Sequence, residues 1–286
     1  MPQKFQKGVL TMKLGFLTNY SEEEVKFASE VGFTSLSLSA GPGSALDATK
    51  LTPKEANKIR KTVQKHGICI SAIGHYSNPL DPDRPRGQQV AEYLLSALDV
   101  CEMLGVKVFT TFPGKGEGDS VEQSIALFKE VWSPIVEKAS NKGIKIAFEN
   151  CHGGGGSRPA DWDAMFDAIP SETLGLELDP SHLVWLGIDY IQAVKDYGSR
   201  IYHIHAKDTE IREDILAREG IVGKGWWRFR IPGWGDIDWQ QFISALLDVG
   251  YNGALSIEHE DPVFEGERRR EGLILGFKHL SQFISL

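Results

Sequence analysis

The chain has 286 residues, 41% of them hydrophobic, and a formal net charge of −8. This length and composition are typical of one large domain with a substantial core, and the acidic balance argues against binding to nucleic acid or to anionic membranes. Three scattered cysteines (Cys69, Cys101 and Cys151) are too few for a disulfide framework or a thiolate zinc site.

Residues 1–11 (MPQKFQKGVLT) lack the apolar segment of a signal peptide, and no stretch of the sequence approaches the length of a membrane span. We expect residues 1–11 to form a flexible N-terminal extension and residues 12–286 to form a single domain. The expected location is cytoplasmic, and no membrane partner is expected.

Eight β-rich segments alternate with helical patterns along the rest of the chain. Several are nearly continuous apolar runs, as expected for parallel strands that are covered on both faces. The expected strands are Lys13–Asn19, Ser35–Ser39, Ile68–His75, Val106–Phe112, Ile144–Asn150, Leu174–Asp179, Ile201–Lys207 and Ala254–Glu260. Eight such units without a break in composition predict an α/β fold, one (β/α)8 TIM barrel.

The sequence also marks the helix boundaries between these strands. Ser21 with Glu24, and Thr52 with Glu55, form the pattern of a capping box at a helix N-terminus. The segment Phe264–Leu286 is expected to form a closing amphipathic helix. Glycines expected just after helix C-termini are Gly32, Gly67, Gly105, Gly143 and Gly250.

Two long segments follow strands and would therefore lie on the C-terminal face of a barrel, which carries active sites. They are CHGGGGSRP after the fifth strand and residues 208–237 after the seventh. Three tryptophans of the second segment, Trp226, Trp227 and Trp234, either stack on a sugar face or pack the loop against the barrel rim.

The last four expected strands end in side chains that can bind metal ions. These are Glu149, Asp179, His205 and Glu258, with Glu260 as an alternative to Glu258 because the two share one strand parity. Each residue alone has a structural explanation, such as an ion pair, a helix cap or a hydrogen-bonded core histidine. A metal site explains all four together, because buried charges are costly unless they are paired or metal-bound. Three carboxylates and one imidazole suit manganese, magnesium or cobalt.

The segments FEN, LDPSH, HIHAKD and SIEHED at these strand ends, with TTFPG and YSNPLDPD earlier in the chain, resemble the signature sequences of a known superfamily. It is the superfamily of xylose isomerase-like TIM barrels, in particular the sugar phosphate isomerases and epimerases related to ketose 3-epimerases, inosose dehydratases and endonuclease IV. The resemblance spans the chain from Met12 onward.

The resemblance implies one divalent metal ion, with Mn²⁺ as the first expectation and Mg²⁺, Co²⁺ or Zn²⁺ as alternatives. Glu149, Asp179, His205 and Glu258 match the metal ligands of the family, and Glu149 and Glu258 also match its catalytic acid/base pair. The implied partner is a small-molecule sugar or sugar phosphate. A homodimer or homotetramer is expected only because related barrels often form them.

Further residues around these strand ends are candidates for substrate binding. Lys207 lies two residues after His205 and shares its inward direction, and His203 has the parity of a supporting partner one layer below. His182 matches a substrate-binding or metal-binding histidine of the family. The candidate substrate-binding residues are His75, His152, His182, Lys207, Arg230 and Glu260.

Two departures from the ketose 3-epimerases leave the substrate open. Those enzymes carry a second glutamate after the fifth strand, where this chain has its glycine run, and an arginine where this chain has Ile211, next to Arg212. The leading prediction is a metal-dependent isomerase or epimerase. It would abstract a proton from a ketose, a sugar phosphate or a related keto-polyol and pass through a metal-bound enediolate.

Three alternatives stay open at this point. A metal-dependent lyase that dehydrates a keto-inositol or keto-sugar would begin with the same proton abstraction, with His152, His182 or Lys207 as the acid. An endonuclease IV-type nuclease would need a basic face and more histidines than the eight in the sequence. A non-catalytic sugar-binding barrel is the third alternative.

Overall fold

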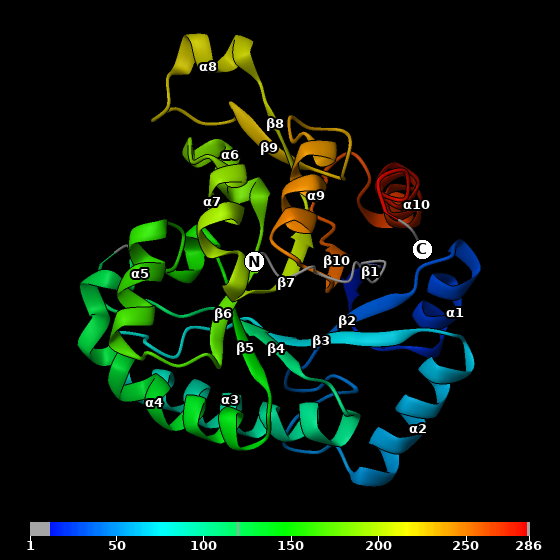
Figure 1. Ribbon diagram of the computed structural model, residues 1–286, viewed down its shortest axis with the longest axis vertical. Helices are drawn as coiled ribbons and strands as arrows, with labels where there is room; N and C mark the ends of the chain where they lie inside the picture. The colour runs from blue at the N-terminus through cyan, green and yellow to red at the C-terminus, as the bar shows by residue number, and fades with distance from the viewer. Residues whose placement is uncertain (1–11, 119, 285–286) are drawn as a thin grey trace, which may run out of the picture.

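The computed structural model describes residues 12–118 and 120–284 (Figure 1). The extension expected at residues 1–11 lies outside the described residues. Within these two ranges, no helix combines the length and the apolar character needed to cross a membrane.

In the described part of the chain, eight parallel strands close into a barrel in the order β1-β10-β7-β6-β5-β4-β3-β2. This arrangement confirms the predicted (β/α)8 TIM barrel. The barrel strands are β1 (Lys13–Thr18), β2 (Ser35–Ser39), β3 (Cys69–His75), β4 (Val108–Thr111), β5 (Lys145–Glu149), β6 (Leu174–Leu178), β7 (Ile201–Ala206) and β10 (Ala254–Ile257).

Helices form the outer layer around the strands (Figure 1). The α-helices of the described chain are α1 (Glu22–Val31), α2 (Pro53–Lys65), α3 (Arg84–Leu104), α4 (Ile125–Asn141), α5 (Pro159–Ala168), α6 (Pro180–Leu186), α7 (Tyr190–Tyr197), α8 (Glu213–Glu219), α9 (Trp239–Asp248) and α10 (Arg269–Leu280). Of these, α8 does not cover the strands but lies beyond one end of the barrel (Figure 1). Thr52 and Glu55 form the predicted capping box at the start of α2. The five glycines predicted to follow helices all have positive φ angles.

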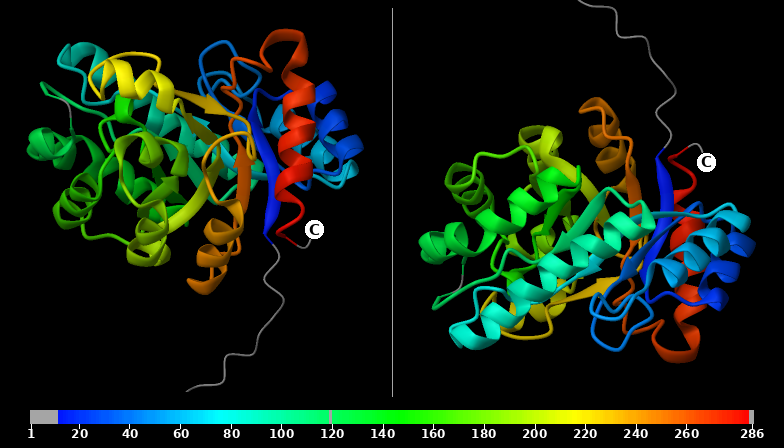
Figure 2. Two further views of the ribbon diagram at one scale, coloured as in Figure 1. Left: turned by 90° about the horizontal axis from the view of Figure 1, so that it is seen from above. Right: turned by 90° about the horizontal axis from the view of Figure 1, so that it is seen from below.

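Two predictions at the helix ends need correction. Ser21 caps α1, but the Glu24 side chain pairs with Arg269 of α10 at 3.0 Å instead of completing a capping box. The closing helix is shorter than the predicted Phe264–Leu286, because α10 covers only Arg269–Leu280. α10 lies beside β1, so the Glu24–Arg269 ion pair ties the last helix to the first unit of the barrel (Figure 2).

Strand alternation positions the side chains at the barrel mouth. Phe148 of β5 packs edge-to-face on Trp132 of α4, with 4.7 Å between ring centroids. Because successive side chains of a strand point to opposite faces, Glu149 turns away from the helix layer. On the last strand, β10 ends at Ile257, so Glu258 follows the strand instead of lying in it as predicted.

The long segment after β7 is a small sheet with a helix, not an irregular loop. β8 (Asp208–Ile211) and β9 (Trp227–Arg230) pair antiparallel, and α8 connects them beyond the barrel mouth (Figure 1). Trp227 stacks on Trp185 of α6 with 4.6 Å between centroids, and Trp226 is buried. Trp227 therefore packs the segment against the rim, whereas the buried Trp226 donates to the carbonyl of Ile221 within the segment and Trp234 is 47% exposed.

Candidate metal centre

Four donor groups converge at the C-terminal ends of β5, β6, β7 and β10. One donor atom from each of Glu149, Asp179, His205 and Glu258 lies within 4.8 Å of the other three. Nδ1 of His205 is 3.2 Å from Oε1 of Glu149 and 3.3 Å from Oε2 of Glu258. Three carboxylates and one imidazole form a suitable donor set for a hard or borderline divalent cation.

Asp179 uses its two carboxylate oxygens differently. Oδ1 accepts a hydrogen bond from the backbone N–H of Ser181 at 2.8 Å and caps α6. Oδ2 is buried, accepts no hydrogen bond from the described residues, and forms an ion pair with Nζ of Lys207 at 3.1 Å. The Asn150 side chain bonds both the N–H and the carbonyl of Asp179, which fixes this backbone. A buried oxygen without a hydrogen bond, facing three other donor groups, fits a bound cation.

Lys207 places a buried ammonium group beside the same carboxylates. The residue is 2% exposed, and its Nζ lies 2.5 Å from Oε2 of Glu258 and 2.9 Å from Oε2 of Glu260. The ammonium also lies 4.3 Å from the ring centroid of Phe229 in β9. The sequence left open whether Glu258 or Glu260 belongs to the group of donor residues. In the structure, Glu258 is part of the four-residue cluster, and Glu260 contacts Lys207 at the edge of that cluster.

His182 of α6 also adjoins the cluster. Its Nε2 lies 3.4 Å from Nζ of Lys207, 3.6 Å from Oδ2 of Asp179 and 3.7 Å from Oε1 of Glu149. The ring is 4% exposed and packs edge-on against Phe229. The structure therefore brings two of the predicted substrate-binding residues, His182 and Lys207, into contact with the proposed ligands.

Three other predicted residues lie outside the cluster. His75 ends β3 and lines a cavity at the ends of β1, β2 and β3. His152 is exposed in the loop after β5. Arg230 of β9 is buried, but its guanidinium pairs with Oε2 of Glu210 at 2.6 Å and with Oδ2 of Asp261 at 2.9 Å. These ion pairs give Arg230 a role in holding β8, β9 and the segment after β10 together.

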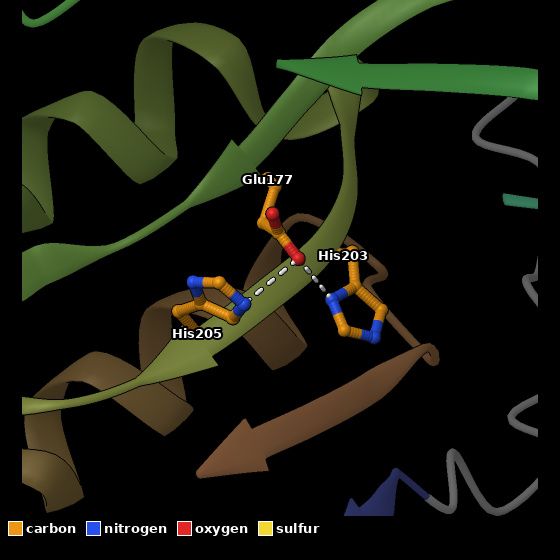
Figure 3. A group of neighbouring side chains, drawn as sticks. All are labelled: Glu177, His203 and His205. Carbon is orange, nitrogen blue, oxygen red and sulfur yellow. Dashed lines mark hydrogen bonds and ion pairs between the residues drawn. The ribbon is translucent and has the colours of Figure 1, made fainter. Parts of the chain in front are cut away.

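A buried glutamate beneath the cluster, Glu177, was not among the residues predicted from the sequence. Glu177 of β6 is fully buried, and its Oε1 lies 2.8 Å from Nδ1 of His203 and 3.1 Å from Nε2 of His205 (Figure 3). The hydroxyl of Tyr76 donates to its Oε2 at 2.8 Å. A signal was present, because Glu177 is an acid in an apolar strand and shares the inward parity of Asp179.

Opposing effects set the protonation of the two cluster glutamates. Burial raises the pKa of the Glu149 carboxyl, but the facing His205 and Lys207 charges outweigh it and lower the pKa to about 2. Burial likewise raises the pKa of Glu258, and Lys207 and His205 lower it to about 2. Both carboxyls are therefore ionised at neutral pH.

These shifts predict a loss of stability in acid. A carboxyl whose folded-state pKa lies below its ordinary value of 4.5 stabilises the fold above pH 4.5, and this contribution disappears as the pH falls toward 2. We expect the free energy of unfolding of the metal-free protein, measured by urea titration, to fall across that range. In Glu149→Gln, the free energy of unfolding should depend less steeply on pH. The difference should correspond to the binding of at most about one proton on unfolding. Parallel curves for the two proteins would contradict the shift at Glu149.

A cavity of about 540 Å³ lies at the ends of β1, β2 and β3, and one of its lining residues, Tyr76, has its hydroxyl 3.3 Å from Nε2 of His205. Its polar lining includes Asn19, Ser39, Ser44, His75 and Tyr76. No lysine, arginine, aspartate or glutamate is among the described residues that line it. Burial lowers the pKa of His75, so this ring is neutral at pH 7. The cavity is thus polar but uncharged, and it has the size of a small-molecule site.

Comparison with known proteins identifies relatives that include a named enzyme. The chain is 27% identical over 317 aligned positions to the YfiH protein of Bacillus subtilis (strain 168), covering 96% of this chain and 100% of that one. It is 29% identical over 230 residues to an inosose dehydratase of Clostridium perfringens (strain 13 / Type A), covering 73% of this chain and 76% of the relative.

Two solved structures share the fold. One is a D-psicose 3-epimerase determined in the presence of D-fructose, with a TM-score of 0.73 and 16% identity over 96% of this chain and 99% of that one. The other is the IOLI protein with a zinc atom, with a TM-score of 0.73 and 20% identity over 96% of this chain and 100% of that one. Residues 25–281 match the family model described as xylose isomerase-like TIM barrel. The strand-end resemblance, the closed barrel and this match agree, and the chain belongs to the xylose isomerase-like TIM barrel family.

Proposed function

We propose that the protein is a divalent-metal-dependent isomerase or epimerase of a ketose or related keto-polyol. Glu149, Asp179, His205 and Glu258 would hold the cation, with Mn²⁺ as the first expectation. The observation that carries this proposal is the convergence of their four donor atoms within 4.8 Å at the barrel mouth. When bound, the cation supplies electrostatic stabilisation for negative charge that develops on substrate oxygens.

The proposed proton transfer uses the two glutamates of the cluster. Glu149 ends β5 and Glu258 follows β10, and these strands lie on opposite sides of β7 in the barrel order. One glutamate would take the proton from the carbon beside the carbonyl while the other returns a proton. Both must be ionised before they accept a proton. The neighbouring charges of His205 and Lys207 favour that state in the metal-free protein, and Lys207 and the bound cation would favour it in the metal-loaded protein. Lys207 would also hold Glu258 in place through its 2.5 Å contact.

The uncharged cavity supports a substrate without a phosphate group. A phosphate dianion is normally bound by Lys or Arg side chains or by free backbone N–H groups. The described lining residues include neither cation. The N–H of Gly41 already donates to Oγ of Ser44 at 3.2 Å, and that of Gly43 donates to Oδ2 of Asp47 at 2.9 Å. Hydroxyl groups of a polyol would match this lining better.

A second candidate function is a lyase that removes water. It is favoured by Lys207 and His182, which place a buried protonated group beside the proposed base. In a dehydration, a C–H bond next to the carbonyl breaks, a C=C bond forms, and the β-hydroxyl leaves as water after accepting a proton. Lys207 would supply that proton. The similarity to an inosose dehydratase agrees with this candidate.

The two reactions are distinguished by isotope exchange. The metal-loaded protein is incubated in D₂O with unphosphorylated ketoses, their phosphates and keto-inositols, and the products are analysed by NMR after removal of protein and metal. We expect solvent deuterium at one stereocentre of an unphosphorylated substrate. Retention of every hydroxyl means epimerisation or isomerisation, and loss of one means dehydration.

Two controls accompany this screen. Protein treated with a chelator, and the Glu149→Gln variant, should both give no exchange. Absence of exchange with every substrate and every metal would contradict an enzyme that abstracts such a proton, and exchange only with phosphates would overturn the assignment to unphosphorylated substrates.

A further inference from the structure

The inside of the barrel beneath the proposed metal centre is polar where a packed apolar core is usual. Here Glu177 lies between two histidine rings of β7, those of His203 and His205 (Figure 3). This carboxylate, together with His203 and Tyr76, forms a hydrogen-bonded group, the Glu177 network. The Glu177 carboxylate accepts hydrogen bonds from His203 and Tyr76, each at 2.8 Å, and its Oε1 forms an ion pair with Nε2 of His205 at 3.1 Å.

The two nitrogens of His205 face different groups. Nδ1 faces the proposed metal ligands, 3.2 Å from Glu149 and 3.3 Å from Glu258. Nε2 faces the Glu177 network, 3.1 Å from Oε1 of Glu177 and 3.3 Å from the Tyr76 hydroxyl. A flipped ring would present carbon atoms to both sets of oxygens, so the network favours one orientation of the ring.

Contacts from other strands hold the Glu177 carboxylate itself. Oε1 accepts from Nδ1 of His203 at 2.8 Å, and the other nitrogen of His203 lies 3.1 Å from Oγ of Ser71 in β3. Oε2 accepts from the Tyr76 hydroxyl, which lies 2.9 Å from Oγ1 of Thr110 in β4. The carboxylate is therefore fixed from several sides of the barrel.

A buried carboxylate at this position is expensive for the fold. Taking one charge out of water costs several kcal/mol. Well-packed apolar side chains often stabilise a fold as much as a buried ion pair does, or more. Leu176 and Leu178, the strand neighbours of Glu177, are buried apolar residues of the kind that an ordinary core would use. A role beyond packing accounts for the acid at this site.

We propose that Glu177 is a positioning residue for the metal centre. Oε1 of Glu177 faces Nε2 of His205 at 3.1 Å, and in the metal-loaded protein it would accept the Nε2–H, which would fix the ring orientation and the tautomer and leave the lone pair of Nδ1 for the cation. This inference rests on the proposed function, because it requires that Nδ1 of His205 binds a metal ion. Histidine ligands in general donate their second N–H to such a partner, and removal of the partner typically lowers metal affinity by about 10- to 100-fold.

The test measures Zn²⁺ affinity by competition with a chromogenic chelator, in the full-length protein. Glu177→Met removes both acceptor oxygens and should weaken Zn²⁺ binding by about 10- to 100-fold. Glu177→Gln keeps one acceptor oxygen of the same shape without the charge, so its loss should be smaller, about three- to tenfold. Asp161→Asn changes a fully buried carboxylate that pairs with Arg158 in another part of the fold, and it should leave the affinity unchanged.

A spectroscopic readout separates positioning from general loosening of the fold. In the Zn²⁺-loaded wild type, ¹H–¹⁵N spectra of labelled histidine should show a protonated, slowly exchanging Nε2 on the His205 ring. This signal should be lost or shift strongly in Glu177→Met and stay closer to wild type in Glu177→Gln. In a His205→Ala background, Glu177→Met should give little further loss of affinity, because the two residues act through one interaction.

The outcomes separate this inference from the proposed function. If the wild type binds no Zn²⁺, the metal centre itself is wrong. If the wild type binds Zn²⁺ and Glu177→Met binds it equally tightly with an unchanged Nε2 signal, only the positioning role is overturned. If Glu177→Met does not fold, Glu177→Gln decides, and an affinity equal to that of Asp161→Asn overturns the proposal.

Discussion

Glu258→Gln should lower turnover by about 10³-fold or more, whereas the same change at Glu260 should lower it by about tenfold or less. Glu258 lies in the cluster, 3.3 Å from Nδ1 of His205, and is proposed both to hold the cation and to exchange a proton with the substrate. Glu260 is half-exposed, and its ion pair among the described residues is the 2.9 Å contact with Lys207 at the edge of the cluster. The measurement is kcat and KM for both variants under saturating metal.

Glu260→Gln is the matched control, because it makes the same chemical change two residues away and removes a negative charge that contacts the same lysine. Metal content is measured for each variant, so that loss of the ion is distinguished from loss of the base. Full activity of Glu258→Gln together with an inactive Glu260→Gln would move the role to Glu260. Full activity of both would end the proposed mechanism.

The sequence predicts the barrel well because its signals are local. Apolar runs alternate with capped helices, and the parity of Phe148 and Glu149 in β5 places one side chain against α4 and the other at the mouth. The same reasoning placed Asp179 and His205 at strand ends. Parallel strands bring such ends together, so the four donor groups could be predicted as one group.

The pairing of side chains from distant segments could not be predicted from the sequence. For example, the antiparallel pairing of β8 and β9 brings Glu210 to the guanidinium of Arg230, which also pairs with Asp261. Substrate binding by Arg230 stays a prediction. Glu177 was not predicted, because its proposed role depends on its 3.1 Å contact with Nε2 of His205 in the neighbouring strand. Such distances follow from register and ring orientation, which a residue pattern does not encode.

Lys207→Met should lower the free energy of unfolding of the metal-free protein by about 3–5 kcal/mol, the usual effect of removing one partner from a buried ion pair. The Lys207 ammonium is 2% exposed and lies within 3.1 Å of carboxylate oxygens of Asp179, Glu258 and Glu260. Without it, three acidic groups lose the nearest positive charge. Urea denaturation of wild type and variant after chelator treatment measures the difference.

Added metal should reduce this deficit. A divalent cation bound by Asp179 and Glu258 would replace the charge that Lys207 supplies, so saturating Zn²⁺ should stabilise Lys207→Met more than the wild type. Lys138→Met is the control, since Lys138 pairs with the half-exposed Asp99 at 2.9 Å. It should lose about 0–1 kcal/mol, with or without metal. An equal response of Lys207→Met and wild type to Zn²⁺ would mean that the ammonium and the cation do not share these carboxylates, and the metal centre would have to lie elsewhere.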